Sequence, residues 1–119
     1  MPLSADELTR IAVNEFFRGQ PGADAVQCQL LSIDEIDCNV TSVGIVSRFQ
    51  VQPNAPKVLG GATRRLGGLE GRLLPSDVKC GFELWIENGH IAFLEGFSYS
   101  DDWPHVVDVC QFLHTDHVS

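Results

Sequence analysis

The dipeptide Asn88-Gly89 constrains the fold of this chain more than any other feature. Asn-Gly is the preferred pair for a two-residue type I′ turn, because both positions need a positive φ that these residues tolerate. Alternating apolar and polar residues precede and follow the pair. The sequence therefore predicts a β-hairpin from Gly81 to Tyr99 and fixes which side chains lie opposite one another.

This register places one charge in an unexpected position. With Glu87 opposite His90, we expect Phe82 opposite Glu95, and strict alternation puts Glu95 on an apolar face. The other members of that face are Phe82, Leu84, Ile86, Ile91, Phe93, Phe97 and Tyr99. A carboxylate there is costly unless it is paired, hydrogen-bonded or protonated. The candidate cationic partners are Arg48, Arg64, Arg65 and Arg72.

Three interpretations of Glu95 are open. It forms a structural ion pair or reaches solvent near the end of its strand, or its pKa is raised and it acts as a general acid or base, or a β-bulge at Gly96 moves it off the apolar face. No second carboxylate, serine–histidine pair or cysteine–histidine pair stands around it at a recognisable spacing. The sequence therefore predicts no catalytic residue.

The remaining elements follow from local patterns. Ser4 and Glu7 have the spacing of a capping box, which predicts a helix over residues 4–18. Alternation predicts strands from Ala25 to Ile36 and from Gly44 to Val51, joined by a connection at 37–43. Residues 52–75, rich in glycine, proline and arginine, are expected to form a long loop, in which short helical or extended pieces around Val58 and Leu69 to Leu74 are left open. The segment from His105 to Leu113 reads as a strand or a short helix, and its β-branched residues favour the strand.

These elements predict an α+β fold, with an N-terminal helix packed on a four- to five-stranded, mostly antiparallel sheet. A length of 119 residues predicts a single domain over 1–119. No segment has the pattern of an export signal or a membrane span, so we expect a cytoplasmic protein with no membrane partner.

A net charge of −8 disfavours nucleic acid as a partner, because a phosphate backbone is repelled. The four cysteines, at 28, 38, 80 and 110, are too far apart in sequence for a Cys-x-x-Cys pair and are expected to be free thiols. Cys28 and Cys80 are expected to be buried in strands. His114 and His117 lack a third ligand, so neither a metal nor a cofactor is predicted.

One candidate ligand site follows from the hairpin. It is lined by Phe82, Glu95, Tyr99 and Trp103, with Arg64 or Arg65 of the long loop opposite. For Trp103 the alternative is a structural anchor that pins the end of the strand against the helix.

The C-terminal half resembles the closing segment of a group of small uncharacterised bacterial proteins, some of which are immunity-like. The matching residues are Phe82–Ile86, Asn88-Gly89, Leu94–Tyr99 and Trp103-Pro104, about a quarter of the chain. The group carries a cysteine- and glycine-rich loop before the second strand, where this chain keeps only Cys38. The resemblance implies no catalytic residues.

The sequence thus favours an interaction module that binds another protein or itself, and an immunity-like or homo-oligomeric protein is the form expected. The alternative is a small-molecule binder or enzyme with its pocket around Glu95, Tyr99 and Trp103. A structural accessory domain without a discrete site is a third interpretation.

Overall fold

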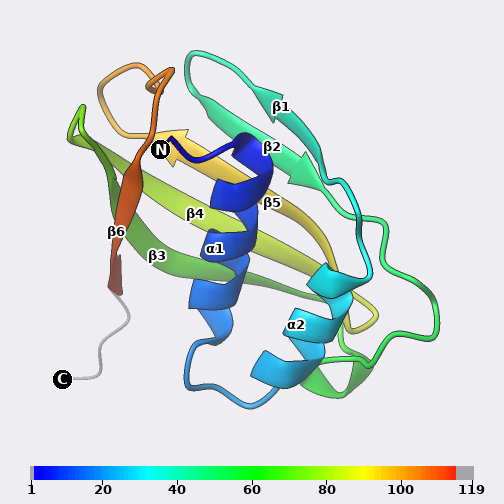
Figure 1. Cartoon of the computed structure of the whole chain (residues 1–119). Helices are drawn as coiled ribbons and strands as arrows, with labels where there is room; N and C mark the ends of the chain where they lie inside the picture. The colour runs from blue at the N-terminus through cyan, green and yellow to red at the C-terminus, as the bar shows by residue number, and fades with distance from the viewer. Residues whose placement is uncertain (1, 115–119) are drawn as a thin grey trace, which may run out of the picture.

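The computed structural model describes residues 2–114 of the chain and shows an α+β fold (Figure 1). Its elements are α1 (Ala5–Phe17), α2 (Ala23–Leu31), β1 (Asp37–Val40), β2 (Gly44–Arg48), the 3₁₀ turn η1 (Leu59–Gly61), β3 (Arg64–Leu74), β4 (Val78–Glu87), β5 (His90–Ser98) and β6 (Val109–His114). All neighbouring strands are antiparallel, in the order β1-β2-β5-β4-β3-β6. The predicted class is confirmed, but the sheet has six strands rather than four or five, and a second helix is present.

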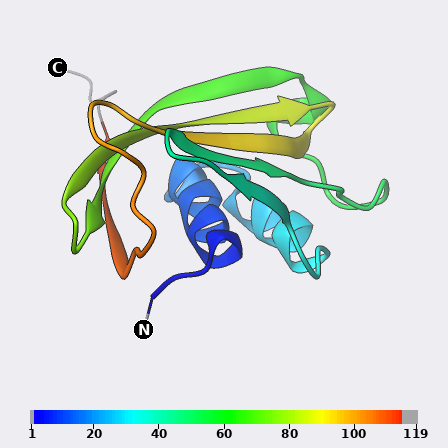
Figure 2. The ribbon, with the colours of Figure 1, turned by 90° about the horizontal axis from the view of Figure 1, so that it is seen from above.

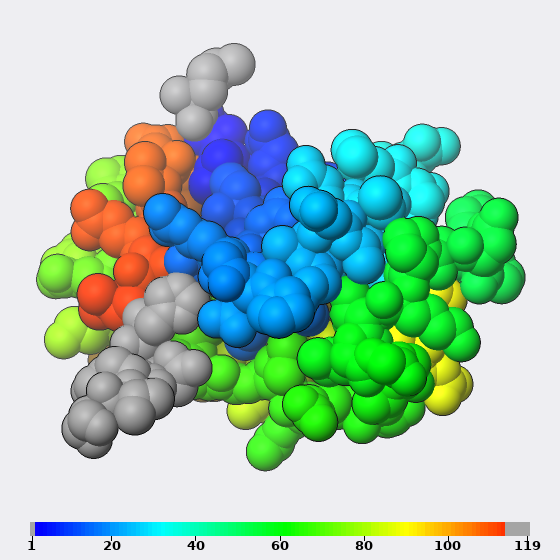
Figure 3. Space-filling view, turned by 90° about the horizontal axis from the view of Figure 1, so that it is seen from below, coloured from blue at the N-terminus to red at the C-terminus, as the bar shows by residue number. Residues whose placement is uncertain are grey.

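Both helices pack on the same face of the sheet (Figure 2), which we call the inner face. No helix or strand among residues 2–114 covers the opposite, outer face. Figure 3 views the molecule from below in Figure 1, so that the end of α1 and the segment leading into α2, in blue, lie beside the strands rather than in front of them. Within the same residues, no helix is long and apolar enough to cross a membrane.

The N-terminal helix begins as the sequence predicts. Ser4 Oγ accepts from the Glu7 amide at 3.0 Å, and Glu7 Oε1 accepts from the Ser4 amide at 2.9 Å, so the capping box is complete. The helix buries Leu8, Ala12 and Phe17 against the sheet. These contacts place the end of α1 over β3, where the chain turns away.

The segment predicted as a strand from Ala25 to Ile36 is instead helix α2 followed by a short connection. Its buried residues, Val26, Gln29 and Leu30, have the i, i+3, i+4 spacing of a helix. The strand prediction is wrong because it rests on alternation that puts Val26, Cys28 and Leu30 on one face, whereas Gln29 is buried with Val26 and Leu30. Cys28, expected to be buried, is exposed on the helix.

Gln29 is a fully buried amide that joins three parts of the chain. Its Nε2 donates to the Pro56 carbonyl at 2.7 Å and to the Gly89 carbonyl at 2.9 Å. Its Oε1 accepts from the Ile91 amide at 2.9 Å. Helix α2, the loop before η1 and the β4–β5 turn are therefore held together through one side chain.

The connection predicted at 37–43 contains the edge strand β1, which pairs with β2 from Asp37 to Val40. This prediction was wrong because strand β1 is short and mostly exposed, with no apolar alternation to mark it. Strand β2 lies within the predicted strand, although it ends at Arg48 rather than Val51.

The prediction of a long loop at 52–75 is wrong in its second half, although the extended piece left open at Leu69 to Leu74 is present as part of a longer strand. Strand β3 occupies Arg64–Leu74 and pairs with β4 on one side and with β6 on the other. The glycines and arginines of this strand interrupt the alternation of apolar and polar residues by which a strand is recognised. The pairing with β4 shifts between Leu66 and Leu69, which allows Gly67 and Gly68 to be accommodated as an irregularity.

The last described segment, β6, confirms the strand predicted near the C-terminus. Its orientation differs from the expectation, because Val109 and Leu113 are 50% and 56% exposed while Phe112 packs against the core. Alternation in this segment puts Val107, Val109 and Leu113 on one apolar face, but of these only Val107 is buried, and it precedes the strand.

Candidate functional site: the outer face of the sheet

The β4–β5 hairpin turns at Asn88-Gly89 as predicted, with positive φ at both residues (51° and 81°). Glu87 lies opposite His90 and Ile86 opposite Ile91. The register then shifts, because Ala92 is an extra residue on β5 and Trp85 faces Phe93. The Ala92 carbonyl accepts from the Phe49 amide at 2.9 Å, next to the pairing of β5 with β2. A bulge is therefore present, although not at Gly96.

This bulge reverses the facing of every later residue of β5. Leu94 points into the core and is fully buried, whereas Phe93, Glu95 and Phe97 lie on the outer face and are half-buried. Glu95 pairs with Glu83 of β4 rather than with Phe82. The prediction that Glu95 lies among the apolar residues of the inner face is wrong, because it assumed an uninterrupted alternation.

A row of cationic and aromatic side chains crosses the middle of the outer face. The antiparallel registers place Arg48, Phe93, Trp85 and Arg65 side by side on β2, β5, β4 and β3. The rings of Trp85 and Phe93 are stacked, with centroids 4.4 Å apart and planes at 12°. The Arg48 guanidinium carbon lies 5.9 Å from the Phe93 centroid, within the range of a cation–π contact.

Two carboxylates lie directly opposite one another beside this row. Glu83 and Glu95 are cross-strand partners, a like-charge arrangement that destabilises a sheet. Arg65 Nη1 lies 3.8 Å from Glu83 Oε1. Among residues 2–114, no ion pair engages Glu95. Of the two carboxylates, Glu83 therefore has a cationic neighbour, and Glu95 forms no ion pair with the residues that the structure describes.

Tyr99 covers the next part of the outer face. Its hydroxyl lies over Gly81 of β4, where a Cβ would come within 2.6 Å of the oxygen, so only glycine fits there. The Tyr99 hydroxyl donates to Glu70 Oε2 at 2.6 Å, and its ring meets Phe97 edge-on at 5.8 Å between centroids. Burial of the hydroxyl and its bond to the Glu70 carboxylate raise the pKa of Tyr99 to about 12.

The outer face carries little of the chain's net charge of −8. The cations that β2, β3 and β4 place on it are Arg48, Arg65, Arg72 and Lys79. The carboxylates that β1, β3, β4 and β5 place on the same face are Asp37, Glu70, Glu83, Glu87 and Glu95, and Asp37 lies opposite Arg48. Most of the excess of acidic residues therefore lies elsewhere on the molecule.

A hollow of about 410 Å³ indents this face at the β6 end. Its lining includes Tyr99, Leu113, Lys79 and Arg72. The ring of Tyr99 and the side chain of Leu113 are about half exposed there, at 49% and 56%. The outer face thus combines a flat aromatic centre with an indentation beside it.

The structure does not bring the predicted ligand-site residues together. Phe82 and Trp103 lie in the core, where their rings meet edge-on at 6.4 Å between centroids. Glu95 and Tyr99 lie on the outer face. Trp103 is 5% exposed, and its amide donates to the Ser42 carbonyl at 2.8 Å, which fits the alternative interpretation as an anchor.

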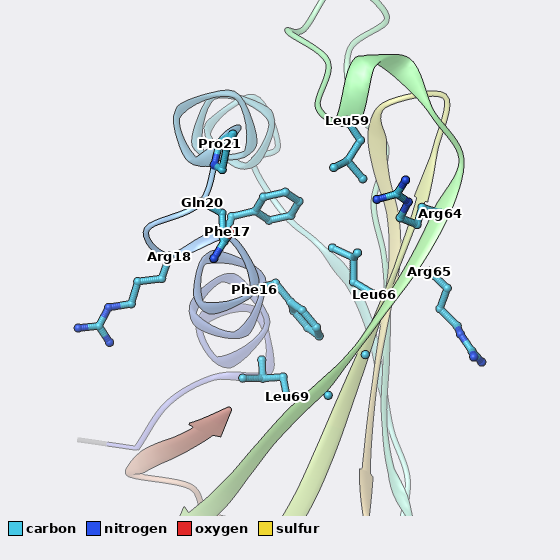
Figure 4. A pocket seen from close by; sticks show the side chains of 12 residues that line it. Phe16, Phe17, Arg18, Gln20, Pro21, Leu59, Arg64, Arg65, Leu66 and Leu69 are labelled. Carbon is cyan, nitrogen blue, oxygen red and sulfur yellow. The ribbon is translucent and has the colours of Figure 1, made fainter. Parts of the chain in front are cut away.

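The two arginines of the predicted site point to opposite faces of β3 (Figure 4). Arg65 shares the outer face with Trp85, as described above. Arg64 pairs in register with the inward-facing Ile86 and lines a cavity between β3 and the end of α1. Neither guanidinium is paired with Glu95.

The thiols and histidines form no metal site within residues 2–114, where no three metal-binding side chains come together. All four cysteines are free. Cys80 is buried, as expected, and its contact with the Cys110 thiol together with burial raises its pKa. The predicted pair of His114 and His117 lies outside the side chains that the structure describes.

Sequence reasoning missed the aromatic and cationic row. Uninterrupted alternation puts Trp85 on the mixed face of the hairpin, which is correct, but it puts Phe93 on the opposite, apolar face. Alternation in the segment from Gly44 to Val51 puts Arg48 on the polar side of its strand, and Arg48 does lie on the outer face. Only the extra residue at Ala92 was needed to join Trp85, Phe93 and Arg48, and nothing in the sequence marks that position.

Comparison of the chain with protein-family models, with curated proteins and with solved structures found no match.

Proposed function

We propose that this chain is a protein-interaction module and that its contact surface is the outer face of the sheet. The observation that carries the proposal is the stacked pair of Trp85 and Phe93, which lies between Arg48 and Arg65 on a face that no described element covers. Tryptophan, tyrosine and arginine are the residues most enriched among the energetic centres of protein interfaces.

The charge distribution supports the same proposal. A chain with a net charge of −8 repels another acidic protein over most of its surface. The outer face carries four cations against five carboxylates, so a partner docks there with much less of that general repulsion. Its alternating guanidinium and carboxylate groups also complement a second copy of the same face, and self-association is therefore one form of the proposal. An immunity-like role in the cytoplasm is a narrower form, suggested by the C-terminal sequence.

The competing function is a small-molecule binder with a pocket around Glu95, Tyr99 and Trp103. The sheet separates Glu95 and Tyr99 from Trp103. The side chains of Glu95 and Tyr99 lie on the outer face, whereas Trp103 packs on Phe82 on the inner side. This arrangement favours the protein-interaction module over that pocket.

The proposal is tested with the affinity-tagged chain expressed in its source cells. The variant Trp85→Ser removes the aromatic centre, and the control Leu31→Ser removes an exposed apolar residue, 74% accessible, from α2 on the other side of the molecule. Each tagged protein is captured, and co-purifying proteins are quantified, while sedimentation velocity reports self-association.

We expect the same partner, or the same dimer, from the unaltered chain and from Leu31→Ser. Loss from Trp85→Ser should be at least tenfold, as for truncation of an interface centre. Urea unfolding of each variant shows that the fold is intact. Equal capture by Trp85→Ser, or equal loss from both variants, contradicts the proposal.

A further inference from the structure

A cavity of about 440 Å³ lies on the inner side of the molecule, between the end of α1 and the first half of β3 (Figure 4). This volume falls within the range of small-molecule sites. It is separate from the outer face, because β3 itself lies between them. The cavity therefore needs an explanation of its own.

The hollow exists because helix α1 stops short of it. Helix α1 ends at Phe17, and the chain then turns away through Gln20 and Pro21. Gly67 and Gly68 of β3 contribute no side chains to fill the space.

The floor and walls of the cavity are apolar. Phe16, Leu59 and Leu66 are half-buried and pack against the core on one side, and Leu69 below them is fully buried. Figure 4 shows Phe16 and Leu66 pointing toward one another across the space. An apolar group placed between them would be removed from water on both sides, which stabilises binding in proportion to the area covered.

The charged residues of the lining are all cationic. Arg18, Arg64 and Arg65 line the cavity, and no aspartate or glutamate does, in a chain that has 16 acidic and 8 basic residues. Arg65 points to the outer face and contacts Glu83, and Arg18 lies 3.7 Å from Glu15. Arg64 remains on the cavity side of β3, is exposed, and forms no ion pair within residues 2–114.

We propose that this cavity binds a small amphipathic carboxylate, with its apolar part between Phe16 and Leu66 and its carboxylate on the guanidinium of Arg64. A planar guanidinium donates two parallel hydrogen bonds to a carboxylate, which makes arginine the preferred partner for that group. The adjoining apolar walls select against small hydrophilic anions. This inference does not depend on the proposed protein-interaction surface.

The test uses isothermal titration calorimetry on the full chain with two carboxylates and their neutral amides. Octanoate and octanamide represent a flexible chain, and 1-naphthoate and 1-naphthamide represent a ring. We expect at least one carboxylate to bind and its amide to bind at least tenfold more weakly, as the loss of a charge-assisted hydrogen bond predicts. The carboxylate that binds more tightly identifies the shape of the apolar part.

Two arginines on opposite faces of the sheet provide a pair of variants. Arg64→Gln should weaken carboxylate binding at least tenfold, whereas Arg48→Gln, on the outer face and outside the cavity lining, should change it less than twofold. Leu66→Trp should abolish binding by filling the space. The proposal is overturned if neither carboxylate binds, if the amide binds as well as the acid, or if both arginine variants lose binding equally.

Discussion

Glu95 lies directly opposite Glu83 on the outer face of the sheet, in the antiparallel pairing of β5 with β4. Two carboxylates in this arrangement repel one another, and the Arg65 side chain, 62% exposed and 3.8 Å from Glu83, screens only one of them. A sheet optimised for stability alone would not keep this pair. Its presence beside the Trp85–Phe93 stack agrees with a surface used for contact.

Removing the charge of Glu95 is therefore expected to stabilise the fold. Glu95→Gln should raise the free energy of unfolding by about 0.2–1 kcal/mol at low ionic strength, and the gain should shrink as salt is added. Urea denaturation measures this change. The control is Glu87→Gln, on the same hairpin but opposite His90, which should give no gain. A destabilised Glu95→Gln variant would show that the carboxylate has an attractive partner.

Gln29 should be the most sensitive polar residue of the inner side. In Gln29→Leu, the carbonyl of Pro56 and the amide of Ile91 lose their partner, whereas the Gly89 carbonyl still accepts from the Val58 amide. Unsatisfied groups of this kind cost about 1–3 kcal/mol each, so we expect a loss of about 2 kcal/mol or more in urea denaturation. Gln27→Leu, an exposed position of the same helix, should change stability by less than about 0.5 kcal/mol.

Tyr99 is the only tyrosine of the chain, so absorbance at 295 nm reports its ionisation without overlap from another tyrosine. The midpoint should lie near its raised pKa of about 12. Because the folded state holds this proton more tightly than the unfolded chain, the associated stability is complete below about pH 10 and is lost as the pH rises toward 12.

The variant Glu70→Gln removes the carboxylate that accepts a hydrogen bond from the Tyr99 hydroxyl. The midpoint of the Tyr99 titration should therefore fall toward the ordinary value for tyrosine. Circular dichroism over the same pH range separates ionisation in the folded state from unfolding. An unaltered midpoint in Glu70→Gln would mean that the bond between the two side chains does not set the pKa.

The cysteines should differ sharply in reactivity. Cys28 is exposed on α2, whereas Cys80 is buried with a raised pKa, and thiolates rather than thiols react with disulfide reagents. Native protein treated with Ellman's reagent should show a fast phase of one thiol that disappears in Cys28→Ser. In denatured protein all four thiols should react with the reagent. Fast labelling of Cys80, located by mass spectrometry, would contradict the buried position.

The elements that could be predicted from sequence are those with a local chemical signature. Ser4 and Glu7 predict the start of α1, and Asn88-Gly89 predicts the turn between β4 and β5. Both structures can be predicted because they depend on residues only a few positions apart. The β4 half of the hairpin was also assigned to the correct faces, since it alternates without interruption up to Trp85.

The elements that could not be predicted depend on tertiary contacts. Helix α2 buries Gln29 only because its amide finds three distant backbone partners, and β3 forms despite its glycines because β4 and β6 pair with its two edges. The bulge at Ala92 is stabilised by the amide of Phe49 on the neighbouring segment. Because of that single extra residue, Glu95 and Phe93 lie on the outer face rather than on the predicted apolar face. The candidate site is therefore on the outer face as well.

Site-specific photo-crosslinking inside the source cells tests the central claim most directly. A benzophenone amino acid replaces Phe97 on the outer face or, as a control, the exposed Gln27 of α2. The account predicts one dominant adduct from position 97, either with a second copy, at twice the chain's mass of 13.1 kDa, or with one other protein, and none of it from position 27. Equal adducts from both positions, or an adduct from position 27 alone, would contradict the assignment of the outer face as the contact surface.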